Sequence, residues 1–150
     1  MNNLEKAKEL LQNSNFTCVA CKDDITLACQ QRGVAPLLGW LDERTSLKGF
    51  SAADKVVGNG AAFLYVLLDV KELYADVISK SALKTLSQHH ISVTYGVLTD
   101  AIRNRDNTGF CPIESAVEGI TSPEIALTTI RNRLKEMKKA WITEGSEKPV

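Results

Sequence analysis

Residues 72–97, ELYADVISKSALKTLSQHHISVTYGV, decide the fold class of this chain. The segment ELYADVIS is rich in β-branched and aromatic residues and predicts a strand, and ISVTYGV predicts a second one. Between them, SALKTLSQHH has the apolar spacing of a helix. Because strands joined through a helix can pair in parallel, this segment predicts a βαβ unit in an α/β domain.

The N-terminal part of the chain adds helices and a hairpin. Apolar residues at helical spacing predict an amphipathic helix over residues 3–13. The segments FTCVAC (16–21) and ITLACQ (25–30) are separated by KDD and predict a β-hairpin. A second helix is predicted over residues 33–43, followed by a polar loop, TSLKGF, at 45–50.

The next segment, residues 51–68, predicts one buried helix. Ser51 and Asp54 have the spacing of a capping box, and KVVGNGAAFLYVLL is then apolar nearly all round. Gly58 and Gly60 would fall inside this helix, where each costs about 1 kcal/mol, so we expect close approach of another backbone or a ligand to offset them. A dinucleotide-binding loop is not expected, because such a loop lies between a strand and a helix.

The C-terminal part predicts a short helix over residues 111–120 and a long one over 122–141, with Ser122 as the N-cap of the long helix. Residues 143–150 are expected to form a flexible tail. Together the elements predict a single domain over residues 1–142. Its fold class is α/β: a three-layer α/β/α sandwich whose mixed sheet combines an antiparallel hairpin with parallel strands.

Composition argues against several function classes. The 150 residues suit one domain with a substantial core. The 18 basic and 18 acidic residues cancel, so general nucleic-acid binding is not expected. The longest apolar run, GAAFLYVLLDV, is too short for a bilayer span of roughly 20 residues. Because the N-terminus lacks the apolar stretch of a signal peptide, we expect a cytoplasmic protein without membrane association.

Three of the four cysteines, Cys18, Cys21 and Cys29, lie in the predicted hairpin. Cys18 and Cys21 form a C-x-x-C, but residues three apart on a strand face opposite sides of a sheet. No second ligand pair follows at the spacing of a zinc site. We therefore expect three reduced, partly buried and inert thiols that pack as small hydrophobic side chains.

The fourth cysteine, Cys111, is a candidate functional thiol within NRDNTGFCPIES (104–115). It falls at the N-cap of a predicted helix, with Glu114 at the capping-box position. Cysteine is a poor cap, and the free N–H groups at a helix start favour a thiolate, so a structural cap and a functional thiol both stay open. His89 and His90 end a predicted surface helix and are interpreted as solvated side chains.

Three segments carry a family resemblance: RGVAPLL (32–38), ADKVVGNGAA (53–62) and NRDNTGFCPIE (104–114). In this order and separation they resemble an uncharacterised prokaryotic family, domain of unknown function 1893, which is placed in the cytidine-deaminase-like superfamily. The resemblance runs over roughly residues 14–135, and NRDxTGxCPxE is its specific motif. It implies a mixed sheet of about five strands between helices.

The same resemblance bears on zinc chemistry. In active deaminases a buried helix supplies a His or Cys with a Glu two residues on, a later helix start supplies P-C-x-x-C, and the bound zinc activates water. Here the buried helix offers only VGNGA at residues 57–61, and the later helix keeps Cys111 with Glu114 in place of the second thiolate. One thiol and one carboxylate make a poor zinc site. The resemblance therefore implies a member with no metal site and no cofactor.

The leading hypothesis is a zinc-free cytidine-deaminase-like protein that binds a small molecule, such as a nucleotide, in the pocket that the resemblance implies. The residues assigned to this pocket are Lys55, Asn59, Arg103, Arg105, Asp106, Cys111 and Glu114. Asn59 would read polar edges of the ligand, and Cys111 with Glu114 would form the floor. Two alternatives stay open: a thiol-dependent enzyme with Cys111 as nucleophile, and a homo-oligomeric interaction module.

Overall fold

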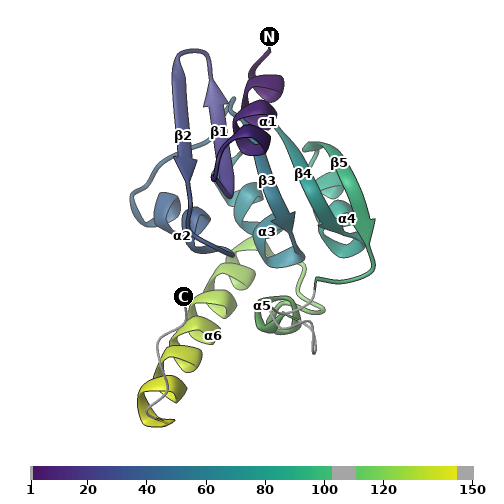
Figure 1. Ribbon diagram of the computed structural model, residues 1–150. Coiled ribbons are helices and arrows are strands. Elements are labelled where there is room, and N and C mark those ends of the chain that lie inside the picture. Colours follow the sequence, from purple (N-terminus) through teal and green to yellow (C-terminus); the bar gives the residue numbers. More distant parts are fainter. Residues whose placement is uncertain (1, 103–110, 145–150) are drawn as a thin grey trace.

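The computed structural model describes residues 2–102 and 111–144. The strands are β1 (Cys18–Lys22), β2 (Ile25–Cys29), β3 (Ser51–Val57), β4 (Glu72–Ser79) and β5 (Ser92–Thr99). They form one open sheet in the spatial order β2-β1-β3-β4-β5 (Figure 1). β1 runs antiparallel to both of its neighbours, whereas β3, β4 and β5 are parallel. The predicted mixed sheet of about five strands is confirmed.

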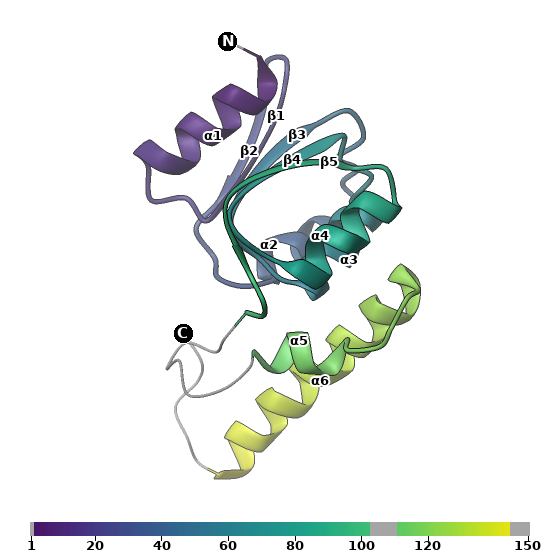
Figure 2. The same ribbon diagram turned by 90° about the vertical axis from the view of Figure 1, so that its right-hand side faces the viewer.

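Helices cover both faces of the sheet. They are α1 (Asn3–Asn13), α2 (Ala35–Asp42), α3 (Asn59–Leu68), α4 (Lys80–Gln88), α5 (Pro112–Ala116) and α6 (Pro123–Glu144). α1 lies on one face, α2, α3 and α4 lie on the other, and α5 and α6 lie beyond that second helical layer (Figure 2). α6 packs on α3 and α5. No helix within residues 2–102 and 111–144 is long and apolar enough to cross a membrane.

The elements that the sequence predicts most directly are confirmed. β4, α4 and β5 form the βαβ unit, with β4 and β5 paired in parallel along their whole length. The hairpin pairs Cys18 with Cys29. The first helix covers residues 3–13, where Asn2 and Glu5 complete a capping box. α6 continues to Glu144, and residues 145–150 of the predicted tail lie outside the described residues.

The prediction of one helix over residues 51–68 is wrong. Residues 51–57 form β3, and α3 begins only at Asn59, with Gly58 as its N-cap residue. Ser51 caps nothing, since its hydroxyl donates to Glu72 Oε2 on β4 at 2.6 Å. β3 is the central strand between β1 and β4, and its first four residues form one buried run, because both faces of the sheet are covered there. Such a run has no alternation that separates it from a following buried helix.

The loop at residues 45–50 is also less polar than predicted. Leu47 and Phe50 are buried in the main core, and Lys48 forms an isolated antiparallel bridge with Val70. Backbone hydrogen bonds from Leu47 N to Leu68 O and within the loop hold it in place. The loop therefore closes one end of the core, because it brings two large apolar side chains under the sheet.

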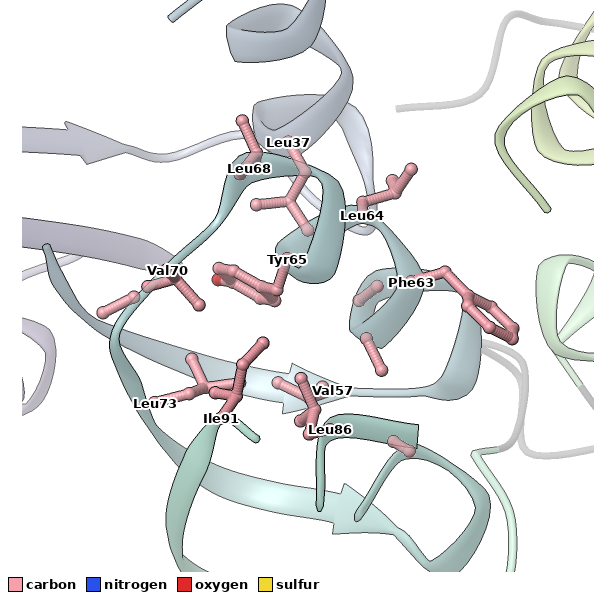
Figure 3. Close-up of a cluster of buried hydrophobic side chains, with 14 of the residues drawn as sticks. Leu37, Val57, Phe63, Leu64, Tyr65, Leu68, Val70, Leu73, Leu86 and Ile91 are labelled. Carbon is pink, nitrogen blue, oxygen red and sulfur yellow. The ribbon is translucent and has the colours of Figure 1, made fainter. Parts of the chain in front are cut away.

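The core has two parts, one on each face of the sheet. The larger part lies between the sheet and α2, α3 and α4, and the smaller part lies under α1. Seven of the ten residues of α3 are buried, which explains its lack of a polar face. Figure 3 shows Tyr65 of α3 among the aliphatic side chains of this core. Because Tyr65 carries the only hydroxyl among the side chains labelled there, its partners matter for stability.

Candidate functional site

The candidate site lies at the carboxyl ends of β3 and β4. β3 leads through Gly58 into α3, and β4 leads directly into α4, so two helix N-termini meet at this edge of the sheet. The arrowheads of both strands point towards α5 (Figure 1). In open α/β sheets, ligands collect at the carboxyl ends of the strands, where helix N-termini offer free N–H groups.

Glu114 of α5 joins these helix starts. Its Oε1 accepts a hydrogen bond from the backbone N–H of Asn59 at 2.7 Å and a longer one from the Ser79 hydroxyl at 3.4 Å. Asn59 is the first residue of α3, and Ser79 is the N-cap of α4. A carboxylate at a helix N-terminus is stabilised by the free N–H groups and by the helix dipole. One side chain therefore fastens the first turn of α5 onto the starts of α3 and α4.

The Glu114 carboxyl has unusual proton affinity. Burial raises its pKa above the ordinary value of 4.5, because a charged carboxylate loses solvation there. The hydrogen bonds from Asn59 N–H and the Ser79 hydroxyl act in the opposite direction and only partly offset burial. Glu114 is therefore a carboxyl that holds its proton to a higher pH than a solvated glutamate, and it can accept or donate a hydrogen bond near this edge.

At residue 58, the Glu114 side chain, and not the local backbone conformation, favours a glycine. Gly58 has a φ of −93° and a ψ of 178°, which are open to any residue. A Cβ at this position, however, would lie 2.1 Å from Glu114 Oε1 and 2.7 Å from Glu114 Cδ. Gly60 has a similar neighbour, since its Cβ would lie 2.6 Å from Ile113 Cγ2. Side chains of α5, and not the backbone or the ligand that the sequence predicted, approach these two glycines closely.

A dinucleotide-binding loop was not expected because both glycines were predicted to lie inside a helix, and this reason is wrong for Gly58. Gly58 lies between β3 and α3, where such a loop would be, and Gly60 is the second residue of α3. The fingerprint G-x-G-x-x-G would still need a third glycine, and Phe63 occupies that position. In addition, Glu114 already takes the backbone N–H at the helix start. A pyrophosphate site is therefore still not expected, on different grounds.

Asn59 is oriented by a residue that the sequence analysis missed. Its side-chain Oδ1 accepts a hydrogen bond of 2.5 Å from the hydroxyl of Thr85, which is 7% exposed on α4. Ser79 was also missed, although a polar residue at the end of a predicted strand is a recognisable signal. Thr85 gave no such signal, because a threonine inside a predicted helix resembles an ordinary surface residue.

Of the remaining predicted site residues, Cys111 and Lys55 lie within the described part of the chain. Cys111 is the N-cap residue of α5 and is half-buried; its backbone N–H donates to Ile102 O at 3.1 Å, and its thiol makes no capping hydrogen bond. Lys55 is exposed on β3. Three predicted residues lie outside the described residues: Arg103, Arg105 and Asp106.

Both histidines of the chain lie at the other end of α4. His89 is the C-cap residue of this nine-residue helix, and its Nδ1 is 2.9 Å from Thr85 O. A helix of this length spans about 13 Å at 1.5 Å per residue. Because α4 begins beside Glu114, neither His89 nor His90 is at the edge of the sheet where α5 begins. A histidine base for Cys111 is therefore not present there.

We predict that the purified protein holds no stoichiometric zinc and does not deaminate cytidine. Across residues 2–102 and 111–144, no three His, Cys, Asp or Glu side chains are grouped so that they could hold a metal ion. Structural and catalytic zinc sites need at least three protein ligands. Elemental analysis of protein purified without chelator checks the prediction. One zinc per chain that is lost in Cys111→Ala would contradict it.

Comparisons with known proteins agree with the sequence resemblance at the level of the family. Residues 6–134 match the family described as "Domain of unknown function (DUF1893)". The fold is similar to the crystal structure of a DUF1893 family protein from Thermotoga maritima, with a TM-score of 0.79, 25% sequence identity and 90% of each chain covered. No curated protein matches the chain. Since the family match covers most of its length, the chain belongs to the DUF1893 family.

Proposed function

We propose that this protein binds a small, nucleotide-like molecule at the carboxyl edge of β3 and β4, on a cytidine-deaminase-like fold without the zinc chemistry. The observation that carries the proposal is the hydrogen bond between Asn59 N–H and Glu114, residues 55 positions apart. It brings together three of the residues assigned to the pocket, because Cys111 begins the same short helix as Glu114.

The chemistry of this edge supports a ligand with hydrogen-bonding edges, such as a nucleobase. The Asn59 amide offers both donors and an acceptor, and Thr85 holds it in one orientation. Glu114 accepts hydrogen bonds when ionised and also donates one when protonated. Few precisely placed polar groups beside a buried helix are typical of small-molecule sites. The mixed five-stranded sheet between helices also agrees with the superfamily resemblance.

Thermal shift measurements with nucleobases, nucleosides and nucleotides test the proposal. A ligand that binds only the folded state raises the stability by RT ln(1 + [L]/Kd), about 2.7 kcal/mol at 100-fold excess over Kd. We expect one class of these compounds to raise the Tm in a concentration-dependent manner. Asn59→Ala should abolish the shift in Tm, because it removes the amide that forms hydrogen bonds with the ligand.

A matched control is available in Asn13→Ala, the same substitution at the exposed end of α1, on the opposite face of the sheet. This variant should keep the full ligand-induced shift. The proposal fails if no compound of the panel changes the Tm, or if Asn13→Ala weakens the shift as much as Asn59→Ala does.

A further inference from the structure

Two cysteines face each other across the hairpin at the edge of the sheet. Cys18 of β1 and Cys29 of β2 are register partners in the antiparallel pair, and both thiols are free. Directly opposite residues in such a pair project from the same face of a sheet. The neighbouring pair, Ala20 and Leu27, belongs to the core under α2 and α3, so the two thiols lie on that face.

This pairing has the dimensions that a disulfide needs. Cα atoms of opposite residues in an antiparallel pair are about 4.5–5.5 Å apart, and a disulfide requires about 4.4–6.8 Å. The corresponding Cβ distances are about 4.5–5.5 Å in a sheet and about 3.5–4.5 Å in a disulfide. With these general dimensions, side-chain rotation and a small closing of the two strands would bring the two sulfur atoms within bonding distance.

The two thiols differ in access and in their present contacts. Cys18 is 1% exposed, and its Sγ lies 3.1 Å from the hydroxyl of Tyr65. Burial above all, and then the charge of Asp54, raises the pKa of the Cys18 thiol, and Cys29 acts in the same direction. Cys29 is half-buried on the edge strand, and its Sγ accepts a hydrogen bond from the backbone N–H of Gln31 at 3.4 Å and donates one to Gln31 Oε1 at 3.5 Å. A dissolved oxidant therefore reaches Cys29 first.

We propose that Cys18 and Cys29 form a reversible intramolecular disulfide when the protein meets a peroxide. In the first step the sulfur of Cys29 attacks one peroxide oxygen, which forms an S–O bond, breaks the O–O bond and releases water. In the second step the sulfur of Cys18 attacks the sulfur of Cys29, which forms the S–S bond and breaks the S–O bond. The Cys18 proton leaves with the hydroxide as a second water, so two thiols and one hydrogen peroxide give one disulfide and two waters. A dithiol reductant reduces this disulfide back to two thiols by thiol–disulfide exchange.

The experiment treats the full-length protein with hydrogen peroxide, alkylates the remaining thiols and maps the peptides without reduction. We expect most chains to lose two hydrogen atoms in mass and to yield one cross-linked peptide that contains Cys18 and Cys29. Dithiothreitol should restore the original mass. Because Cys18 leaves the Tyr65 hydroxyl in the bonded form, the near-ultraviolet tyrosine spectrum should change and recover with the mass.

Single substitutions separate this pair from the other thiols. Cys29→Ser lies on the edge strand, where it should not disturb folding, and it should abolish the cross-linked peptide. Cys21→Ser is the matched control: Cys21 is in the same hairpin, but it lies in the core under α1 and its register partner is Thr26. This variant, and Cys111→Ser, should form the cross-link as the parent does. The inference is overturned if peroxide oxidises Cys29 only to sulfinic acid, or links it to Cys111 or to a second chain.

Discussion

Asp54 alone is expected to lower the free energy of unfolding by on the order of 4 kcal/mol as the pH rises from 4 to 8, and Asp54→Asn should remove that loss. Asp54 lies on the central strand β3 and is only 7% exposed. Its Oδ2 accepts a 2.7 Å hydrogen bond from the Tyr65 hydroxyl, and its Oδ1 accepts one of 3.3 Å from Val56 N. Among the described residues, no basic side chain forms an ion pair with it.

The direction follows from the proton affinity of this carboxyl. Burial raises the pKa of Asp54 from 3.8 to about 7, although hydrogen bonds from Tyr65 and from the backbone act to lower it. The folded state therefore binds the proton more tightly than the unfolded state. The contribution to stability is fully present below about pH 4, is lost as the pH rises through about 7, and changes little above that. This slope is opposite to that of a carboxylate stabilised by an ion pair.

Urea unfolding of the parent and Asp54→Asn at several pH values between 4 and 8 checks the prediction. An amide is never charged here, and it can donate to the Tyr65 oxygen while the tyrosine hydroxyl turns to Cys18 Sγ, 3.1 Å away. The variant should therefore be more stable than the parent by about 1–3 kcal/mol at pH 8 and no more stable at pH 4.

Asp100→Asn serves as the control for this comparison. Asp100 is exposed and pairs with Lys80 at 2.7 Å, and this contact lowers the pKa of Asp100. Its titration therefore lies below the pH range in question, and its removal should leave the slope between pH 4 and 8 unchanged. Parallel stability curves for the parent and Asp54→Asn would contradict the prediction.

The same residue shows why part of the fold could be predicted from the sequence and part could not. The hairpin and the βαβ unit are bounded by turns and a helical segment, so local patterns fix their limits. In β3, Asp54 ends a buried run of four residues, and the exposed Lys55 and Val56 follow it, so the segment lacks the regular alternation that marks a strand. The spacing of Asp54 from Ser51 is that of a helix capping box. In the structure, however, Asp54 accepts a hydrogen bond from Tyr65 of α3. Tertiary burial, which a local pattern does not contain, decides this segment.

The sequence indicated some of the residues that meet at this edge of the sheet, but not their geometry. Asn59, Cys111 and Glu114 were selected from a motif resemblance, and the structure places all three at the starts of α3 and α5. The hydrogen bond between Asn59 N–H and Glu114 joins residues 55 positions apart, and a periodic sequence pattern does not predict such a contact. Thr85 was absent from the prediction because its role appears only when α4 is packed beside α3, whereas Ser79 could have been included as a polar residue at the end of a predicted strand.

Gly58→Ala is expected to destabilise the protein by about 1–2 kcal/mol, although its backbone geometry suits alanine. The new Cβ would displace the Glu114 carboxylate and break its bond to Asn59 N–H, a charge-assisted hydrogen bond worth about 1.5–3 kcal/mol. Alanine recovers about 0.4–1 kcal/mol by restricting the unfolded chain. In Glu114→Ala, where no carboxylate remains to be displaced, Gly58→Ala should instead be neutral or stabilising.

A double-mutant cycle on Gly58 and Glu114 measures this coupling by urea unfolding, with an expected interaction of about 1.5–3 kcal/mol. Gly39→Ala is the matched control, because a Cβ on this glycine of α2 meets no atom within 4 Å, so it should only stabilise, by about 0.5–1 kcal/mol. If Gly58→Ala in the parent is as benign as Gly39→Ala, then Glu114 is not fixed against the start of α3. The hydrogen bond between Glu114 and Asn59 N–H would then not hold α5 at the carboxyl edge of the sheet. A full coupling, in contrast, makes Glu114 the residue that any ligand at the start of α3 must displace or contact.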